Sequence, residues 1–138
     1  MAAKTDAFSP DLFRVIDANL NRLKEGIRVI EDIARYLQND KALASRLKSL
    51  RHQSRIDDLQ HLLASRDSVN DVLRPTVSSE MRRDSLTSIL IANYKRAQES
   101  SRVLEEMYKI VNPALSETFK QIRYELYTIE KTHLLNSE

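Results

Sequence analysis

The sequence contains no cysteine, and this absence excludes disulfide bonds and thiolate metal sites. It is also compatible with a reducing compartment. Glycine occurs once, at Gly26, and proline three times in 138 residues, a composition that favours long helices and few turns. The 22 basic and 20 acidic residues are mixed along the chain, so the formal net charge is only +2. Because nucleic-acid-binding proteins usually concentrate basic charge on one face, this balance argues against a nucleic-acid partner.

Two further absences narrow the functional classes. The chain has no signal peptide and no apolar run of membrane length, so we expect a cytoplasmic protein without a membrane partner. It also lacks the G-x-x-x-x-G-K-[ST] and G-x-G-x-x-G motifs. Any nucleotide site must therefore use side chains rather than a glycine-rich loop.

The chain repeats part of its own sequence. Residues 18–32, ANLNRLKEGIRVIED, match residues 92–106, ANYKRAQESSRVLEE, and LKSLRH at 47–52 matches FKQIRY at 119–124. The aligned polar pairs are Asn19/Asn93, Arg22/Arg96, Glu25/Glu99, Arg28/Arg102, Glu31/Glu105 and Arg51/Arg123. Duplication of a packing unit alone would keep the apolar positions and let the polar ones drift. The repeat therefore indicates a site as well as a fold.

Apolar residues recur at helical spacing through most of the chain. The first stripe consists of Phe13, Ile16, Leu20, Leu23, Ile27, Ile30, Ala34 and Leu37. We expect four helices near residues 10–38, 41–64, 80–111 and 113–135. The starting signals are Ser9 before Pro10, Asp40, Ser78 or Ser79, and Asn112 before Pro113. In the second helix the stripe moves from Leu43, Leu47 and Leu50 to Ile56, Leu59 and Leu63, which predicts either a kink or contacts on two sides.

These elements predict an all-α fold in which a duplicated helical hairpin forms a four-helix bundle with internal pseudo-two-fold symmetry. The expected organisation is a flexible tail at 1–8 and a single domain at 9–138. Within this domain, repeat one spans 10–64, a loop spans 65–79 and repeat two spans 80–135. A loop of this length without regular structure is usually functional or disordered.

Several polar residues fall inside or beside the apolar arc of the first and third helices. On a helical wheel Asn19 and Arg22 lie within the arc and Glu25 on its rim, and Asn93, Arg96 and Glu99 repeat this pattern. Charged groups in an apolar arc must be paired or must face a cavity, so they form either a site or a buried ion pair that fixes the register. Arg28, Glu31 and Arg35, by contrast, are typical of a solvated edge.

Loop 65–79 alternates guanidinium and carboxylate groups at Arg66, Asp67, Asp71 and Arg74. This pattern suits the handling of phosphate and Mg²⁺, and a solvated linker is the alternative.

Five separated blocks together resemble one family. They are DANLNRLKEGIRVIED at 17–32, LRH at 50–52, RDSVND at 66–71, ANYKRAQESSRVLEE at 92–106 and RYELYTIE at 123–130. The chain resembles, over roughly residues 12–132, the helical hydroxymethylpyrimidine phosphate kinase family. The same domain is also found fused at the N-terminus of some bacterial thiamine-phosphate synthases, and the catalytic barrel of those proteins has no counterpart in this sequence.

The resemblance implies ATP-dependent phosphorylation of 4-amino-5-hydroxymethyl-2-methylpyrimidine phosphate to the diphosphate, with ATP and Mg²⁺ as cofactors. In this interpretation Arg22, Glu25, Arg96 and Glu99 are catalytic. Substrate and phosphate are bound by Asn19, Asn93, Arg51, Arg123 and Arg66, and the metal by Asp67 and Asp71. Loop 65–79 would close over the site. The alternative is a non-catalytic regulatory or docking domain that partners thiamine-phosphate synthase. The sequence leaves the oligomeric state open, and it is compatible with a homo-oligomer.

Overall fold

The computed structural model describes residues 10–76 and 82–136, and all regular structure in this part of the chain is helical. The predicted all-α fold is confirmed. The predicted tail at 1–8, the Ser9 cap and the start of the third helix at Ser78 or Ser79 lie outside the described residues.

The first helix, α2, spans Pro10–Asp32, and a π-helical turn, η1, continues it over Ile33–Leu37. The predicted stripe is buried from Phe13 to Ala34, but Leu37 is 64% exposed. A π turn adds one residue to the helical repeat and rotates the later residues about the helix axis, which explains why the 3-4 spacing fails at its last position. Asn39 then adopts a left-handed conformation, with φ of 52°, and the helix ends.

The second predicted helix is two helices, so the single span 41–64 is wrong. Helix α3 covers Lys41–Gln53, and α4 covers Leu59–Ser65. Asp40 caps α3 as predicted by accepting a hydrogen bond from the Leu43 backbone N at 3.0 Å. The change of apolar face therefore marks the end of helix α3 near Ser54. The Ser54 hydroxyl donates to the Leu50 carbonyl.

Helix α5 spans Leu86–Val111 and α6 spans Pro113–Leu135. Residues 82–85 are not helical, so the predicted start at residue 80 is wrong; Ser85 and Ser88 instead form a capping box that begins α5 at Leu86. Pro113 starts α6 as predicted, although the Asn112 side chain makes no capping hydrogen bond.

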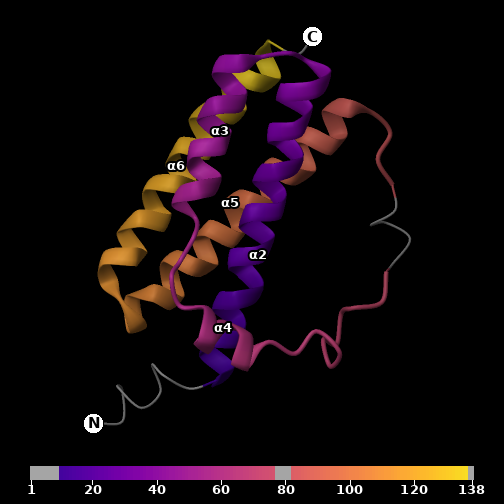
Figure 1. Ribbon diagram of the computed structural model, residues 1–138. Coiled ribbons are helices and arrows are strands. Elements are labelled where there is room, and N and C mark those ends of the chain that lie inside the picture. Colours follow the sequence, from indigo (N-terminus) through magenta and orange to yellow (C-terminus); the bar gives the residue numbers. More distant parts are fainter. Residues whose placement is uncertain (1–9, 77–81, 137–138) are drawn as a thin grey trace.

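Helices α2 and α5 form the centre of the fold and run in opposite directions across one another, with α3 and α6 on one side (Figure 1). Gly26 lies at the α2–α5 crossing, where a Cβ would meet the Asn93 carbonyl oxygen at 3.2 Å and the Ala97 Cβ at 3.5 Å. The absence of a side chain at Gly26 therefore lets the two backbones approach closely. Helices α3 and α4 contact α2, and α6 contacts α5.

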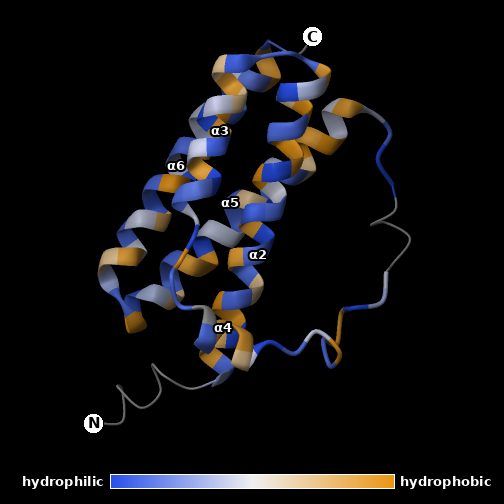
Figure 2. Cartoon of the chain, viewed as in Figure 1, coloured by the Kyte–Doolittle hydropathy of each residue, from blue (hydrophilic) through white to orange (hydrophobic). Residues whose placement is uncertain are grey.

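Each long helix mixes hydrophilic and hydrophobic residues along its length (Figure 2). Within the described residues, no helix combines the length and the apolar character that crossing a membrane requires.

Candidate functional site

The structure separates four of the six repeated arginines, the four predicted to belong to the site, into two kinds. Arg51 and Arg123 are the kind that forms buried ion pairs. Arg51 donates from Nε and Nη2 to the two carboxylate oxygens of Glu31, at 2.6 and 3.2 Å. Arg123 donates from the same two nitrogens to Glu105 Oε1, at 3.1 and 3.0 Å. The Glu31 and Glu105 side chains are only 2% and 7% exposed. The hydrogen bonding of Arg51 to the Glu31 carboxylate raises the pKa of Arg51.

These two ion pairs occupy equivalent positions of the sequence repeat, and each ties a central helix to its neighbour. The expectation that Glu31 lies on a solvated edge is wrong, because Arg51 reaches it from α3. Arg28, by contrast, is half exposed and pairs with Asp32 at 3.4 Å, as a solvated edge would.

Arg22 and Arg96 are the second kind. Both are exposed, and neither side chain has an ion-pair or hydrogen-bond partner within the described part of the chain. The expectation that Arg22 and Arg96 lie in the apolar interior is therefore wrong, and so is the alternative that they form buried ion pairs. Both arginines instead line one cavity of about 510 Å³, which we call the arginine pocket. The pocket is lined by Asn19, Arg22, Asp71, Leu73, Arg83, Ala92, Arg96, Glu99, Ser100 and Val103.

The arginine pocket thus brings together five of the residues that the sequence indicated: Asn19, Arg22, Asp71, Arg96 and Glu99. Asn19 is buried, and its Nδ2 donates to the Val15 carbonyl at 2.9 Å. Asn93 makes the equivalent bond to the Ile89 carbonyl at 2.8 Å, but it lies across from Gly26 and does not line the pocket. Glu25 is exposed and, like Arg51 and Arg123, is not a lining residue.

A second cavity of about 510 Å³ adjoins the first, and we call it the side pocket. It lies between the first half of α2 and residues 66–71, and it shares Asn19, Arg22 and Asp71 with the arginine pocket.

The chain segment that forms one wall of the side pocket is anchored to α2. Arg66 donates from Nε and Nη2 to the Asp17 carboxylate at 2.8 and 2.7 Å, and the Asp17 side chain is 7% exposed. Arg14 donates to the Asp67 carbonyl at 3.1 Å. Because these bonds fix the start of the segment, Asp71 is directed to the boundary between the two pockets.

All three predicted loop ligands, Arg66, Asp67 and Asp71, therefore already have protein partners. Asp71 Oδ1 accepts from the Leu73 backbone N at 3.0 Å. The bond to Asp17 raises the pKa of Arg66. The Asp67 carboxylate accepts from the Asn70 side chain at 2.8 Å and from the Asn70 backbone N at 3.1 Å, and these bonds lower the pKa of Asp67. Closure of loop 65–79 over a ligand stays a prediction, and its last residues, 77–79, lie outside the described residues.

Sequence reasoning missed Arg14 and Asp17, which anchor the segment, and Arg83 of the arginine pocket. Asp17 aligns with Ile91 in the second copy. This mismatch, a charged residue opposite an apolar one, is the sequence signal that could have identified Asp17. Arg83 precedes α5 in an irregular segment, and no periodicity marks it.

The donor set suits a metal ion that arrives with phosphate groups. Among the described residues, no three His, Asp or Glu side chains gather in a way that would hold a metal ion. Protein Mg²⁺ sites, however, commonly use one or two carboxylates together with substrate phosphates. Asp71 and Glu99 are the two carboxylates that line the arginine pocket.

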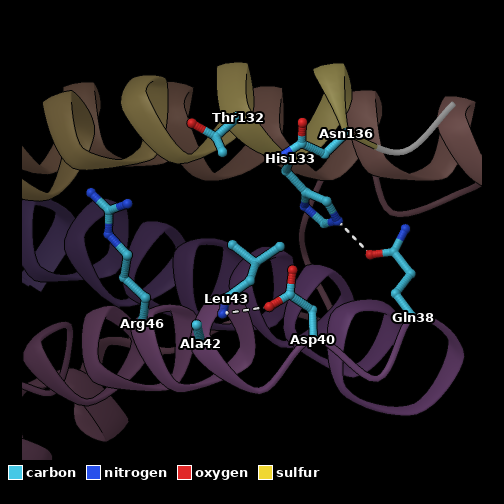
Figure 3. Close-up of a pocket in the computed structure, with 8 residues that line it drawn as sticks. All are labelled: Gln38, Asp40, Ala42, Leu43, Arg46, Thr132, His133 and Asn136. Carbon is cyan, nitrogen blue, oxygen red and sulfur yellow. Dashed lines mark hydrogen bonds between the residues drawn. The ribbon is translucent and has the colours of Figure 1, made fainter.

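Another cavity, of about 440 Å³, lies between the start of α3 and the end of α6 (Figure 3). His133 projects into the space between these helices, with its Nε2 2.7 Å from Gln38 Oε1 and its Nδ1 2.7 Å from the Tyr94 hydroxyl. Burial lowers the pKa of His133. Arg46, which lines the cavity from the α3 side, pairs with Glu125. Because its charged and ring groups already bond to protein partners, this cavity is a weaker candidate than the arginine pocket.

Comparisons with known proteins point to a single family. The chain is 39% identical over 120 residues to a thiamine-phosphate synthase of Nostoc punctiforme, an alignment that covers 86% of this chain and 34% of the relative. It is 39% identical over 127 residues to one of Thermosynechococcus vestitus, covering 91% and 36%. It is 36% identical over 128 residues to one of Rhodopirellula baltica, covering 89% and 34%. The chain therefore spans about a third of the length of these curated relatives.

No solved structure matches the chain. The profile of the ThiD2 family matches residues 14–132, and the chain belongs to that family.

Proposed function

We propose that this protein transfers the γ-phosphoryl group of ATP to 4-amino-5-hydroxymethyl-2-methylpyrimidine phosphate and so forms the diphosphate used in thiamine biosynthesis. The observation that carries the proposal is the arginine pocket, where Arg22 and Arg96 lie without a carboxylate partner among the described residues. The relatives named thiamine-phosphate synthase support the link to thiamine biosynthesis.

The chemistry of phosphoryl transfer matches this set of side chains. Such reactions depend on positioning and on neutralising phosphate charge rather than on covalent catalysis. The pocket contains three guanidinium groups, those of Arg22, Arg83 and Arg96. Each guanidinium can donate two parallel hydrogen bonds to two oxygens of a phosphate. A cavity of about 510 Å³ lies in the range of small-ligand sites.

Asp71 and Glu99 would hold Mg²⁺ together with the nucleotide phosphates. The ion would supply further neutralisation of phosphate charge when bound. The two equivalent Glu–Arg pairs support, in addition, a four-helix bundle with an internal two-fold relation between the hairpins. In this proposal Arg51 and Arg123 maintain that scaffold, and Arg22 and Arg96 bind ligand.

The proposal is tested by comparing Arg96→Met with Arg28→Met in an assay for pyrimidine diphosphate. Arg28 is a matched control, because it is also an exposed arginine on a central helix and its side chain lines neither pocket. Loss of a charge-assisted bond to phosphate should lower kcat/KM about ten- to a hundredfold for Arg96→Met and leave Arg28→Met within about twofold of the wild type. Equal activity of the two variants would contradict the proposed site.

A second candidate function is favoured by the lengths of the relatives. Because the matched region is about a third of each relative, those chains join it to a much longer segment. A non-catalytic docking domain that partners thiamine-phosphate synthase is consistent with this architecture. Co-elution with the synthase, without diphosphate formation by the isolated protein, would favour this function.

A further inference from the structure

The two copies of the repeated arginine occupy different places relative to the two pockets. Arg22 lines both the arginine pocket and the side pocket, whereas Arg96 lines only the arginine pocket. Sequence alignment gives these two residues the same position in the repeat. Their surroundings differ, however, because a segment of the chain lies beside Arg22 and has no counterpart beside Arg96 within the described residues. Residues 66–71, anchored by Arg66 and Asp17, build the side pocket against α2 alone.

The two pockets also differ in charge. The arginine pocket has three arginines and two carboxylates, and the side pocket has three arginines and four carboxylates. In the side pocket Arg66 is already bonded to Asp17. A nucleotide triphosphate therefore suits the arginine pocket, and a neutral ring that carries hydrogen-bond donors suits the side pocket.

The proposed reaction has an unusual requirement at the point where the two ligands meet. The acceptor atom is an oxygen of a phosphate monoester, which is ionised near neutral pH because its second pKa is about 6. A new bond forms from that oxygen to the γ-phosphorus, the bond to the β–γ bridging oxygen breaks, and ADP leaves with the electron pair. No base has to remove a proton, but two anionic groups must come together, and a cation between them lowers their repulsion.

We infer, on the basis of the proposed function, that the two pockets form one site for two substrates in which Arg22 is the catalytic cation at their junction. The nucleotide polyphosphate lies in the arginine pocket on Arg96 and Arg83. The aminopyrimidine ring lies in the side pocket, and its phosphate reaches Arg22. The duplicated motifs thus have different roles: the first copy contacts both substrates, and the second contacts the nucleotide.

The experiment measures two affinities for each of three variants. The ligands are a non-hydrolysable ATP analogue with Mg²⁺ and the pyrimidine monophosphate, each titrated calorimetrically into the full chain. Arg96→Met should weaken binding of the analogue about ten- to a hundredfold and leave binding of the monophosphate within about twofold. Arg22→Met should weaken both ligands and lower kcat when both substrates are saturating. Arg28→Met should change neither affinity. Circular dichroism should show all three variants folded, since the three side chains are exposed.

The outcomes separate this inference from the proposed function. If turnover occurs but Arg22→Met weakens only one ligand, or Arg96→Met weakens both equally, the division of the site is wrong and the kinase proposal survives. If both ligands bind with the expected partition but no diphosphate forms, the division survives and the kinase proposal is wrong. If the wild type binds neither ligand, both are overturned.

Discussion

The same substitution, Arg→Met, should strongly lower the free energy of unfolding for one kind of arginine and leave it nearly unchanged for the other. Methionine keeps much of the length and apolar bulk of arginine but removes its charge. At position 51 the change deprives Glu31 of both hydrogen bonds, at 2.6 and 3.2 Å, while the carboxylate stays 2% exposed. Stranding a buried charge costs about 3–5 kcal/mol, a large part of the free energy of unfolding of a domain this size.

At position 22 the same change removes an exposed guanidinium that has no partner among the described residues, so the free energy of unfolding should change by no more than about 0.5 kcal/mol. Urea titration, monitored by far-ultraviolet circular dichroism, measures the free energy of unfolding of both variants. The Arg51→Met midpoint should fall by on the order of 2 M, given m-values of about 1–3 kcal/mol per molar urea. Adding Glu31→Leu to Arg51→Met should recover most of the loss, because both charges are then absent. Equal stabilities of Arg51→Met and Arg22→Met would refute the division into scaffold and site.

Three other predictions concern separate parts of the molecule. Because burial lowers the pKa of His133, the unfolded chain takes up the proton first. The free energy of unfolding should therefore decrease as the pH falls below about 6.5, and His133→Gln should flatten this dependence in thermal melts between about pH 7 and 5. Gly26→Val should lower the melting temperature, since the added Cβ would stand 3.2 Å from a backbone oxygen of Asn93; an unchanged melting temperature would argue against the close helix crossing. Asp17→Asn should release Arg66 and speed hydrogen exchange in peptides covering 66–71, with the rest of the chain unaffected; unchanged exchange would mean that this ion pair does not hold the segment.

The periodic pattern predicted the helices well, because the side of a helix that packs against the core repeats every three to four residues and the buried positions are apolar. The stripe from Phe13 to Ala34 is buried as expected, and Pro113 begins its helix as expected. The pattern failed where local geometry departs from the regular repeat. Leu37 lies at the end of a π turn, and the segment after Ser54 leaves the helix. Neither event has a strong signal in the identities of single residues.

The candidate site was predictable only in part, for a different reason. The repeat paired Arg22 with Arg96 and Arg51 with Arg123, and the prediction placed all four at the site, because an alignment compares positions within each copy and not their partners. Their environments are set by residues distant in sequence, such as Glu31 opposite Arg51. Pairing across such distances depends on the tertiary fold and is not encoded in local spacing.

The central claim is phosphoryl transfer, and it is tested most directly with ATP labelled at the γ-phosphate. The purified chain is incubated with this ATP, Mg²⁺ and the pyrimidine monophosphate, and the products are separated by chromatography. We predict that the label appears in the terminal phosphate of the pyrimidine diphosphate, with one ADP formed for each diphosphate, and that Arg96→Met forms far less. If the folded wild-type protein leaves the label in ATP, or releases it only as inorganic phosphate, the proposed function is wrong.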